Sequence, residues 1–290
     1  MSHRSFRSTG LVLFAAILLS LGAFAQGSLD VMFEQMDPHI GQALFLRIVE
    51  VSSREEFSRV VVPEITSGAF ELEIDGLETG ELYRIDLFAD VNGNGHYDAP
   101  PVDHAWRIDL PEISADQVIT FVHTTMFTDI GWPPAIDGTI EALEYAETVF
   151  DSQTGMSVSS RAVGDLLYIG LRAPGTGWLS IGFEPELRMQ GANIIIAGIE
   201  NGVLTIEDHY GHSQTAHRLD ATSDIIQAAG IETASESVLE FAIPLDSGDD
   251  EDQALTAGSE ITIILAYQSS DDRLTVRHSK RSTMQVVLYE

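Results

Sequence analysis

Short runs of alternating apolar and polar residues recur about every ten residues along this chain, and they constrain its fold more than any other feature. In the run 69–75, Phe70, Leu72 and Ile74 fall on one side and acidic residues fall on the other. A period of two places alternate side chains on opposite faces of a strand, so this run predicts a half-buried β-strand. Helical periodicity is scarce. The sequence therefore predicts an all-β protein.

The runs fall into two groups, which predict two β-sandwich domains. The first domain is expected over residues 26–130, with about seven strands. Its other clear runs are 43–49, 83–89, 106–110 and 118–123. The segment 130–138 contains Pro133 and Pro134 and is interpreted as a linker, because paired prolines end a strand and stiffen the chain.

The second domain is expected over residues 134–290. Its clearest strand candidates are 166–171, 178–183, 193–199, 203–208, 238–243, 261–267 and 285–289. Two of them, around 194–196 and 263–265, are apolar on both faces, which is typical of strands in the middle of a sandwich. The segment 246–252 is predicted to be a solvated acidic loop.

The first 25 residues have the pattern of an export signal. Basic residues precede the apolar stretch 11–21, which is too short to span a membrane, and the small residues at 23 and 25 form a cleavage site. Residues 1–25 are therefore predicted to be a signal peptide. No later segment reaches about eighteen uninterrupted apolar residues, so the mature chain is expected without a membrane span, in a periplasm or outside the cell.

The charge balance and the missing motifs exclude several functions. The chain carries 45 acidic and 15 basic residues, a net charge of -30, which disfavours binding to nucleic acids or anionic membranes. It has no cysteine, so disulfides do not stabilise it. Because no nucleophile elbow, zinc-protease motif, P-loop or dinucleotide fingerprint is present, an enzyme is not predicted.

Two residues stand out for their chemistry. Met189 lies in the polar loop 184–191, and His278 lies in a basic segment. The basic neighbours of His278 are Arg273, Arg277, Lys280 and Arg281. A thioether and an imidazole are the axial ligands of many haems, and cationic neighbours suit haem propionates. From the residues alone, a loop methionine that covers the sandwich and a basic edge that deters strand pairing stay open as simpler roles.

The second domain resembles a known family through motifs in a fixed order. These motifs are 136–145, 177–183 (Gly-Trp-Leu-Ser-Ile-Gly-Phe), 189–195, 208–211, 216–217, 266–272 and 278–281. Over about residues 134–290 they resemble DOMON domains and the related family-nine carbohydrate-binding modules. The resemblance implies an immunoglobulin-like sandwich that binds haem b or a sugar. Asn193 and Ser282 depart from the residues common in the family, but neither is a ligand position.

The haem-binding branch of the family uses a methionine and a histidine as iron ligands, and Met189 and His278 occupy the matching positions. The resemblance thus implies an electron-transferring b-type haem protein, with a redox partner such as a membrane-bound cytochrome or an oxidoreductase. A non-covalent haem is expected, because a chain without cysteine cannot form the attachment of c-type haems. Arg277, Lys280 and Arg281 are expected near the propionates, and Trp178 beside the pocket.

The alternative reading of this domain is a non-catalytic carbohydrate-binding module, in which Trp132, Trp178 or Tyr210 stacks on a sugar ring. The segment 208–217 also contains three histidines. Their spacing matches no familiar zinc finger, so a metal site, a lining of the haem pocket and a solvated loop all stay open.

In the first domain, the segment 90–98 resembles the start of an EF-hand calcium loop. It has oxygen side chains at its first, third, fifth and ninth positions and Gly95 at its sixth, but Pro101 takes the place of the usual glutamate. The candidate ligands are Asp90, Asn92, Asn94, His96, Asp98 and, as a substitute, Asp103. A simple hairpin tip is the alternative, since Asn-Gly pairs favour turns. The segment is similar to loops of transthyretin-like sandwiches in exported bacterial proteins, which imply no activity.

Three further histidines, His39, His104 and His123, are scattered along the first domain. A sandwich is able to bring such positions together around copper or zinc. Local hydrogen bonding is the simpler role, and the sequence does not decide between the two.

Overall fold

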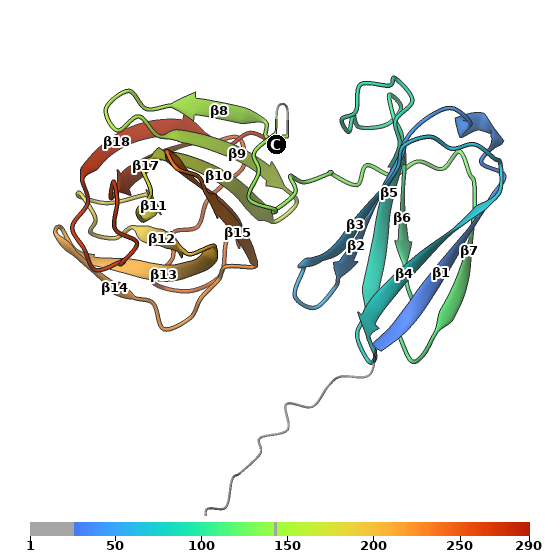
Figure 1. Cartoon of the computed structure of the whole chain (residues 1–290), viewed down its shortest axis with the longest axis horizontal. Coiled ribbons are helices and arrows are strands. Elements are labelled where there is room, and N and C mark those ends of the chain that lie inside the picture. The colour runs from blue at the N-terminus through green and yellow to red at the C-terminus, as the bar shows by residue number, and fades with distance from the viewer. Residues whose placement is uncertain (1–25, 142–143) are drawn as a thin grey trace, which may run out of the picture.

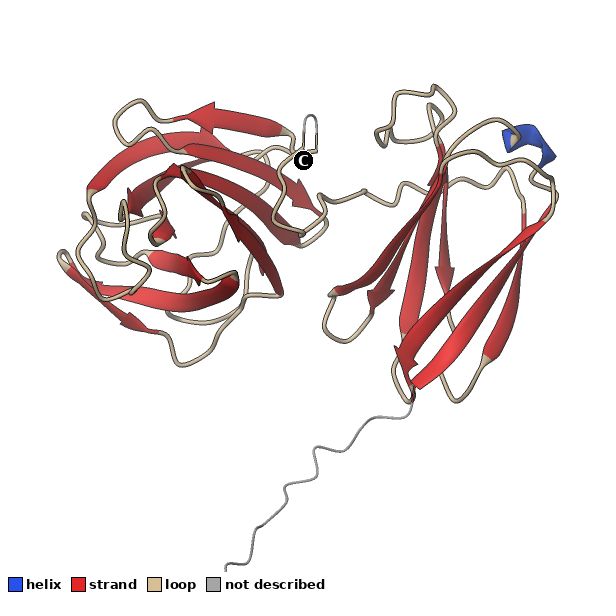
Figure 2. Cartoon of the chain, in the orientation of Figure 1, coloured by secondary structure: helices blue, strands red, loops and turns tan. Residues whose placement is uncertain are grey.

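The computed structural model describes residues 26–141 and 144–290, which form two β-sandwiches joined by a linker (Figure 1). Nearly all regular structure in these residues is strand, apart from the short 3-10 helix η1 (Asp37–His39) (Figure 2). The predicted all-β fold with two sandwich domains is therefore confirmed. The predicted signal peptide, residues 1–25, lies outside the described residues. No helix in the described part of the chain has the length and apolar character of a membrane span.

The first sandwich has a three-stranded sheet, in the order β4-β1-β7, and a four-stranded sheet, in the order β3-β2-β5-β6. The strands are β1 (Gln26–Glu34), β2 (Leu44–Glu50), β3 (Glu56–Val62), β4 (Phe70–Glu78), β5 (Tyr83–Ala89), β6 (His104–Asp109) and β7 (Gln117–Val122). The alternation predicted for β4 holds, because Ile74 is buried while Glu73 and Asp75 are exposed. The core between the sheets includes Val31, Leu46 and Leu87.

Strand pairing brings several loops of the first sandwich to one end. The end of β1 lies beside the end of β7, where Glu34 pairs with Val122. The start of β2 and the start of β6 both pair with Ala89 at the end of β5. The segments that follow β1, β5 and β7 therefore meet at this end, although they are far apart in sequence.

The second sandwich has a five-stranded sheet, in the order β15-β16-β10-β9-β8, and a six-stranded sheet, in the order β14-β13-β12-β11-β17-β18. The strands are β8 (Glu147–Phe150), β9 (Ser157–Val163), β10 (Leu166–Pro174), β11 (Leu179–Phe183), β12 (Asn193–Glu200), β13 (Val203–Ser213), β14 (Ala216–Leu219), β15 (Gln227–Glu232), β16 (Glu236–Pro244), β17 (Glu260–Tyr267) and β18 (Lys280–Val287). Leu167, Ile181 and Phe241 are among the residues that fill the core between the sheets.

All seven strands predicted for this domain are present, and the structure adds four short or weakly patterned ones, β8, β9, β14 and β15. The largest boundary errors are five residues, at β13, which ends at Ser213 rather than near residue 208, and at β18, which begins at Lys280 rather than near residue 285. The first half of β18 is polar, so its sequence does not resemble a strand. It is a strand because it pairs with β17, beginning with Lys280 opposite Tyr267.

The linker packs against the first sandwich. Trp132 is buried, its ring lies 4.9 Å from that of Phe88, and the guanidinium of Arg59 lies 4.9 Å from its centre. A few residues later the chain joins the second sandwich, because the backbone N–H of Gly138 donates to the buried carboxylate of Glu240 at 2.8 Å. The carboxyl group of Glu240 in β16 thus anchors the chain at Gly138.

Candidate functional site

The six-stranded sheet has an outer face that the other sheet does not cover. Leu179 and Ile181 of β11 point into the core, so Ser180 and Gly182 between them point outward. Ile194 and Ile196 of the adjacent β12 also point outward, yet they are only 4% and 2% exposed. Because both of its faces are buried, a strand such as β12 is apolar on both faces. Loops, rather than a third sheet, cover the second face.

Met189 lies in one of these loops, between β11 and β12, and is half-buried. The loop is held against β13, since the backbone N–H of Gly191 donates to the carbonyl of Gly211 at 2.8 Å. A Cβ atom at Gly211 would lie only 1.6 Å from the carbonyl oxygen of Met189. The backbone at Met189 therefore reaches its place only because residue 211 is glycine.

His278 lies in the loop 268–279 between β17 and β18 and is also half-buried. Trp178, just before β11, anchors this loop. Its indole N–H donates to the carbonyl of Val276 at 2.9 Å, and its backbone N–H donates to that of Asp271 at 3.2 Å. A Cβ atom on Gly198 would come within 2.5 Å of the carbonyl oxygen of Asp272. Because Gly198 lies on the outer face with Ile194 and Ile196, the loop folds back over that face.

The structure places Met189 and His278 beyond opposite ends of β11. At one end Phe183 precedes the methionine loop, and at the other Leu179 pairs with Tyr267, which pairs with Lys280. These ends are roughly 13 Å apart at the usual rise of a strand. The two candidate ligands thus belong to two loops that meet the same outer face from opposite ends.

The imidazole of His278 is suited to act as a neutral ligand. Burial lowers its pKa, and the charges of Arg281 and Arg277 lower it further. Arg277, Lys280 and Arg281 are exposed, so their charges lie at the surface beside it. Lys280 and Arg281 belong to β18 rather than to a loop, and the role of the three residues beside a haem stays a prediction.

The three histidines of segment 208–217 do not form one cluster. One ring nitrogen of His217 lies 2.9 Å from one of His209, whose other nitrogen lies 2.8 Å from the carboxylate of Glu207. His212, by contrast, is exposed. His209 shares the outer face with Ile194, its partner in the ladder, so this pair borders the same face as the Met189 and His278 loops.

The structure does not favour the aromatic stacking expected of a sugar site. All three tryptophans of the chain are buried, Trp106 at 4%, Trp132 at 7% and Trp178 at 5% exposure. Tyr210 is half-buried, and the guanidinium of Arg218 lies 5.7 Å from its ring centre.

The loop after β5 gathers most of its predicted calcium ligands but commits their oxygens to other bonds. Asp90 accepts the backbone N–H groups of Gly93, Asn94 and Gly95, and Asp103 accepts those of Val91 and Asp98. The side-chain amides of Asn92 and Asn94 both donate to Asp98 at 2.8 Å. His96 donates its backbone N–H to the side chain of Asn94. These bonds alone order the loop, and calcium there stays a prediction.

Two groups of ionisable residues lie outside the haem and calcium sites predicted from the sequence. His39, His104 and His123, for which a joint metal site and local hydrogen bonding both stayed open, are brought together in the first sandwich. In the second, Asp208, Asp224 and Asp252 meet near the core. Burial raises the pKa of Asp208 to about 6 and that of Asp252 to about 7. The sequence predicts that the segment 246–252 is a solvated acidic loop, but it is not wholly solvated, because Asp252 packs against the buried carboxyl group of Asp208.

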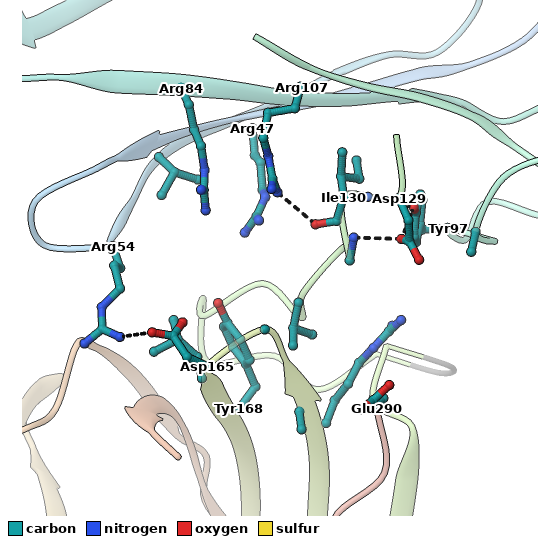
Figure 3. Close-up of a pocket in the computed structure, with 18 of the residues that line it drawn as sticks. Arg47, Arg54, Arg84, Tyr97, Arg107, Asp129, Ile130, Asp165, Tyr168 and Glu290 are labelled. Carbon is teal, nitrogen blue, oxygen red and sulfur yellow. Dashed lines mark hydrogen bonds and ion pairs between the residues drawn. The ribbon is translucent and has the colours of Figure 1, made fainter. Parts of the chain in front are cut away.

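A cavity of about 690 Å³ lies between the two sandwiches (Figure 3). Its arginines are Arg47, Arg54, Arg84, Arg107 and Arg161. Arg47 and Arg107 bind the buried Asp86 at 2.8 and 2.6 Å, and Arg54 pairs with Asp165 of the second sandwich at 2.5 Å. Arg84 lies 3.9 Å from Asp86, whereas Arg161 makes no ion pair within the described residues. Because four of the five charges are paired with carboxylates, we interpret the cavity as a polar domain interface. Neither Met189 nor His278 lines it.

Comparison with known proteins identifies the class of the second sandwich. The model of the DOMON domain family matches residues 151–268, so this sandwich carries a DOMON domain, as its motifs predict. The match includes Met189 and ends before His278. DBH-like monooxygenase protein 1 is 28% identical over 108 residues in Mus musculus and 24% identical over 124 residues in Homo sapiens. These regions cover 37% and 43% of this chain but only 18% and 20% of those proteins, so the chain spans about a fifth of their length.

Two solved structures share a distant likeness with this chain. The cytochrome b domain of pyranose dehydrogenase from Coprinopsis cinerea gives a TM-score of 0.38 at 10% identity, over 48% of this chain and 80% of that one. The cytochrome domain of cellobiose dehydrogenase from Myriococcum thermophilum gives 0.39 at 12% identity, over 49% and 81%.

Proposed function

We propose that the second sandwich binds haem b without covalent attachment, through Met189 and His278, and carries single electrons. The observation that carries this proposal is the pair of loops that meet one apolar outer face, one with a thioether and the other with an imidazole. Burial and neighbouring charges lower the pKa of His278, so its ring is neutral and able to bind iron near pH 7. Met189 and His278 would hold the haem iron, which would supply one-electron chemistry, and a methionine ligand would favour its ferrous state.

The residues around the loops fit such a group. Ile194 and Ile196 supply an apolar floor, and Ser180 and Gly182 add little bulk above β11. At Gly182 a Cβ atom would lie 2.7 Å from the side chain of Ile264, so this part of the face accepts no larger residue as it stands. An apolar, water-poor floor with a polar edge is the usual setting of a cofactor site.

The surface charges assign roles to the ends of the site. Arg277, Lys280 and Arg281 would pair with the propionates, since guanidinium and ammonium groups form charge-assisted bonds with carboxylates. Trp178 would hold the His278 loop rather than touch the iron. With a net charge of -30, the chain would meet its redox partner through a basic surface of that partner, such as an exported or membrane-bound cytochrome or oxidoreductase.

The second sandwich is proposed to be an electron carrier rather than a catalyst, because two protein ligands would leave no iron position for a substrate. It also ranks above carbohydrate binding. A sugar site needs an exposed aromatic face, and Trp132 and Trp178 are buried in the described structure.

The test is an absorption spectrum of the chain after haem is supplied, in oxidised and dithionite-reduced forms. We expect a sharp Soret band and split bands on reduction, and we expect Met189→Ala and His278→Ala each to abolish that pattern. Met126→Ala and His212→Ala are matched controls, since both residues are exposed and lie outside the site. A folded chain that takes up no haem, or variants that keep the parent spectrum, would show the assignment to be wrong.

A further inference from the structure

The first sandwich brings three histidines together at one end. His39 is the last residue of η1, His104 is the first residue of β6, and His123 directly follows β7. One ring nitrogen from each lies within 4.8 Å of the other two. The ring centre of His39 lies 5.1 Å from that of His104 and 5.0 Å from that of His123. Strand pairing therefore creates a cluster from three positions that the sequence separates widely.

Each of these rings carries a buried nitrogen without a hydrogen-bond partner among the described residues. The atoms are Nε2 of His39, Nδ1 of His104 and Nε2 of His123. Buried polar atoms are nearly always satisfied in folded proteins, so three such nitrogens around one point call for a shared partner. His39 is only 1% exposed, so bulk water does not supply that partner to its ring.

The tautomer of His39 is set for metal binding. Its Nδ1 lies 2.7 Å from the side-chain oxygen of Gln42, which only accepts hydrogen bonds. The proton therefore sits on Nδ1, and Nε2 presents its lone pair to the cluster. Such a bond to the far nitrogen is typical of histidines that bind metals, because it fixes the ring and increases its basicity.

Aromatic side chains wall the cluster. The ring of Phe127 stacks on His104 at 3.9 Å, and Trp106 lies 5.5 Å from His39 and 5.6 Å from His123. This rigid wall holds the three imidazoles close together, and imidazole is the commonest side-chain ligand of metal ions.

The loop that precedes His104 is itself fixed. Asp103 is fully buried, and its two carboxylate oxygens each accept a backbone N–H at 2.9 Å, from Val91 and from Asp98. The ring of His104 therefore starts from an ordered backbone rather than from a mobile tip.

We propose that His39, His104 and His123 form a binding site for a divalent copper or zinc ion. Three imidazoles without a thiolate suit these two ions, and copper binds more tightly in the general order of affinities. With bonds of about 2.0–2.1 Å, the three nitrogens would lie roughly 3.3 Å apart, so the rings close by no more than about 1.5 Å. His104 and His123 are half-buried as residues, so an ion can reach the cluster from their side.

This site is independent of the proposed haem site, because it lies in the other sandwich. The full chain is first stripped of metal with a chelator and kept free of haem. Copper(II) and zinc(II) are then titrated separately against a chromophoric competitor, and the copper form is examined by electron paramagnetic resonance. We expect one equivalent of either ion, and nitrogen couplings in the copper spectrum.

The variants His104→Gln and His123→Gln should each weaken binding by more than 100-fold, and Gln42→Leu by about 10–100-fold. His212→Gln is the matched control and should bind as the parent does, since this histidine is exposed in the second sandwich. Circular dichroism of the metal-free variants checks that they fold. If His39→Gln does not fold, the two half-buried histidines still carry the test.

A parent affinity in His104→Gln and His123→Gln would overturn the proposal. The proposal would also be wrong if the double variant Met189→Ala, His278→Ala no longer bound one metal ion although His39, His104 and His123 are intact. The ion would then lie in the second sandwich. Haem binding is measured separately, so its failure leaves this result unaffected.

Discussion

The two sandwiches hold their candidate ligands in opposite ways. In the first, His104 and His123 lie at the ends of paired strands and His39 ends the short helix η1, and one ring nitrogen from each already lies within 4.8 Å of the other two. In the second, Met189 and His278 lie in loops at opposite ends of β11. Sheet pairing fixes the first arrangement, whereas loop conformation decides the second. The first site is therefore expected to be rigid before its ligand arrives, and the second to close around its ligand.

The treatment of buried carboxyl groups differs in degree between the sandwiches. In the first, the fully buried Asp86 is paired with Arg47 and Arg107, whereas the buried Asp90 and Asp103 accept backbone N–H groups and make no ion pair within the described residues. In the second, Asp208, Glu240 and Asp252 make no ion pair within the described residues. A buried carboxyl group without a cationic partner tends to keep its proton. Burial raises the pKa of Asp103 in the first sandwich, but it raises those of Asp208, Glu240 and Asp252 in the second to about 6 or 7, so pH should affect the second sandwich more strongly.

The largest effect on stability is expected at Trp106, which belongs both to the core of the first sandwich and to the wall of the histidine cluster. Trp106 is 4% exposed, its indole N–H donates to the carbonyl of Thr124 at 3.0 Å, and it forms the wall beside His39 and His123. Trp106→Ala should lower the free energy of unfolding of the first sandwich by about 3–5 kcal/mol. It should also weaken copper binding. Urea denaturation followed by circular dichroism, with the copper titration, measures both.

Trp178→Ala is the matched substitution in the second sandwich. Trp178 holds the loop of His278 through a bond to Val276, so its loss should disturb haem uptake and leave copper binding unchanged. If Trp106→Ala leaves both stability and copper affinity as in the parent, the cluster in the first sandwich is not a preformed site.

Most of the fold follows from local sequence pattern. The alternation around Phe70, Leu72 and Ile74 predicts β4, and the doubly apolar stretch around Ile195 predicts a central strand. The pattern does not reveal what covers the second face of such a strand. That depends on where the loop 268–279 folds, and Gly198, which allows its close approach, gives no periodic signal.

The two candidate sites also differ in how far a local sequence pattern reveals them. Met189 and His278 were found because each belongs to a family motif in the sequence. The cluster of His39, His104 and His123 has no motif, because it depends on the pairing of β1 with β7 and of β5 with β6. A histidine at each of several strand ends is the one signal available, and only the pairing order tells which ends meet.

The pH dependence of stability should separate the two sandwiches. Burial raises the pKa of Asp208 to about 6 and the pKa values of Glu240 and Asp252 to about 7. Between about pH 4 and pH 7 these groups hold protons in the folded state that the unfolded chain has released. Folding therefore takes up protons, so the second sandwich should lose stability as pH rises through this range, by at most about 1.4 kcal/mol for each unit by which a folded-state pKa exceeds its unfolded value. Urea midpoints at several pH values measure it.

Asp252→Asn removes one of these groups and should flatten the dependence on pH. Asp246→Asn, which changes an exposed residue of the same segment, is the control and should not. A second sandwich that grows more stable between pH 4 and pH 7, with Asp252 intact, would contradict the assignment of protonated buried carboxyl groups.

The smallest effect on stability is expected when Gly211 is replaced by alanine. This substitution should act mainly on the proposed haem site. A Cβ atom there would lie 1.6 Å from the carbonyl oxygen of Met189 and 2.7 Å from its carbonyl carbon, so the methionine loop must move. Because the obstacle is backbone, no side-chain rotation relieves it. Gly211→Ala should lower the free energy of unfolding by roughly 1–2 kcal/mol and remove the spectrum of a methionine-ligated haem.

The neighbouring His212→Ala is the control, because its side chain is exposed on the same strand. It should keep the parent spectrum, and copper binding in the first sandwich should be unchanged in both variants. A parent haem spectrum in Gly211→Ala would mean either that the loop adapts without moving the thioether or that Met189 is not a ligand, and Met189→Ala in the same background separates these outcomes. A loop that adapts so readily would support a site that closes on its ligand, whereas the histidine cluster, fixed by strand pairing, has no such freedom.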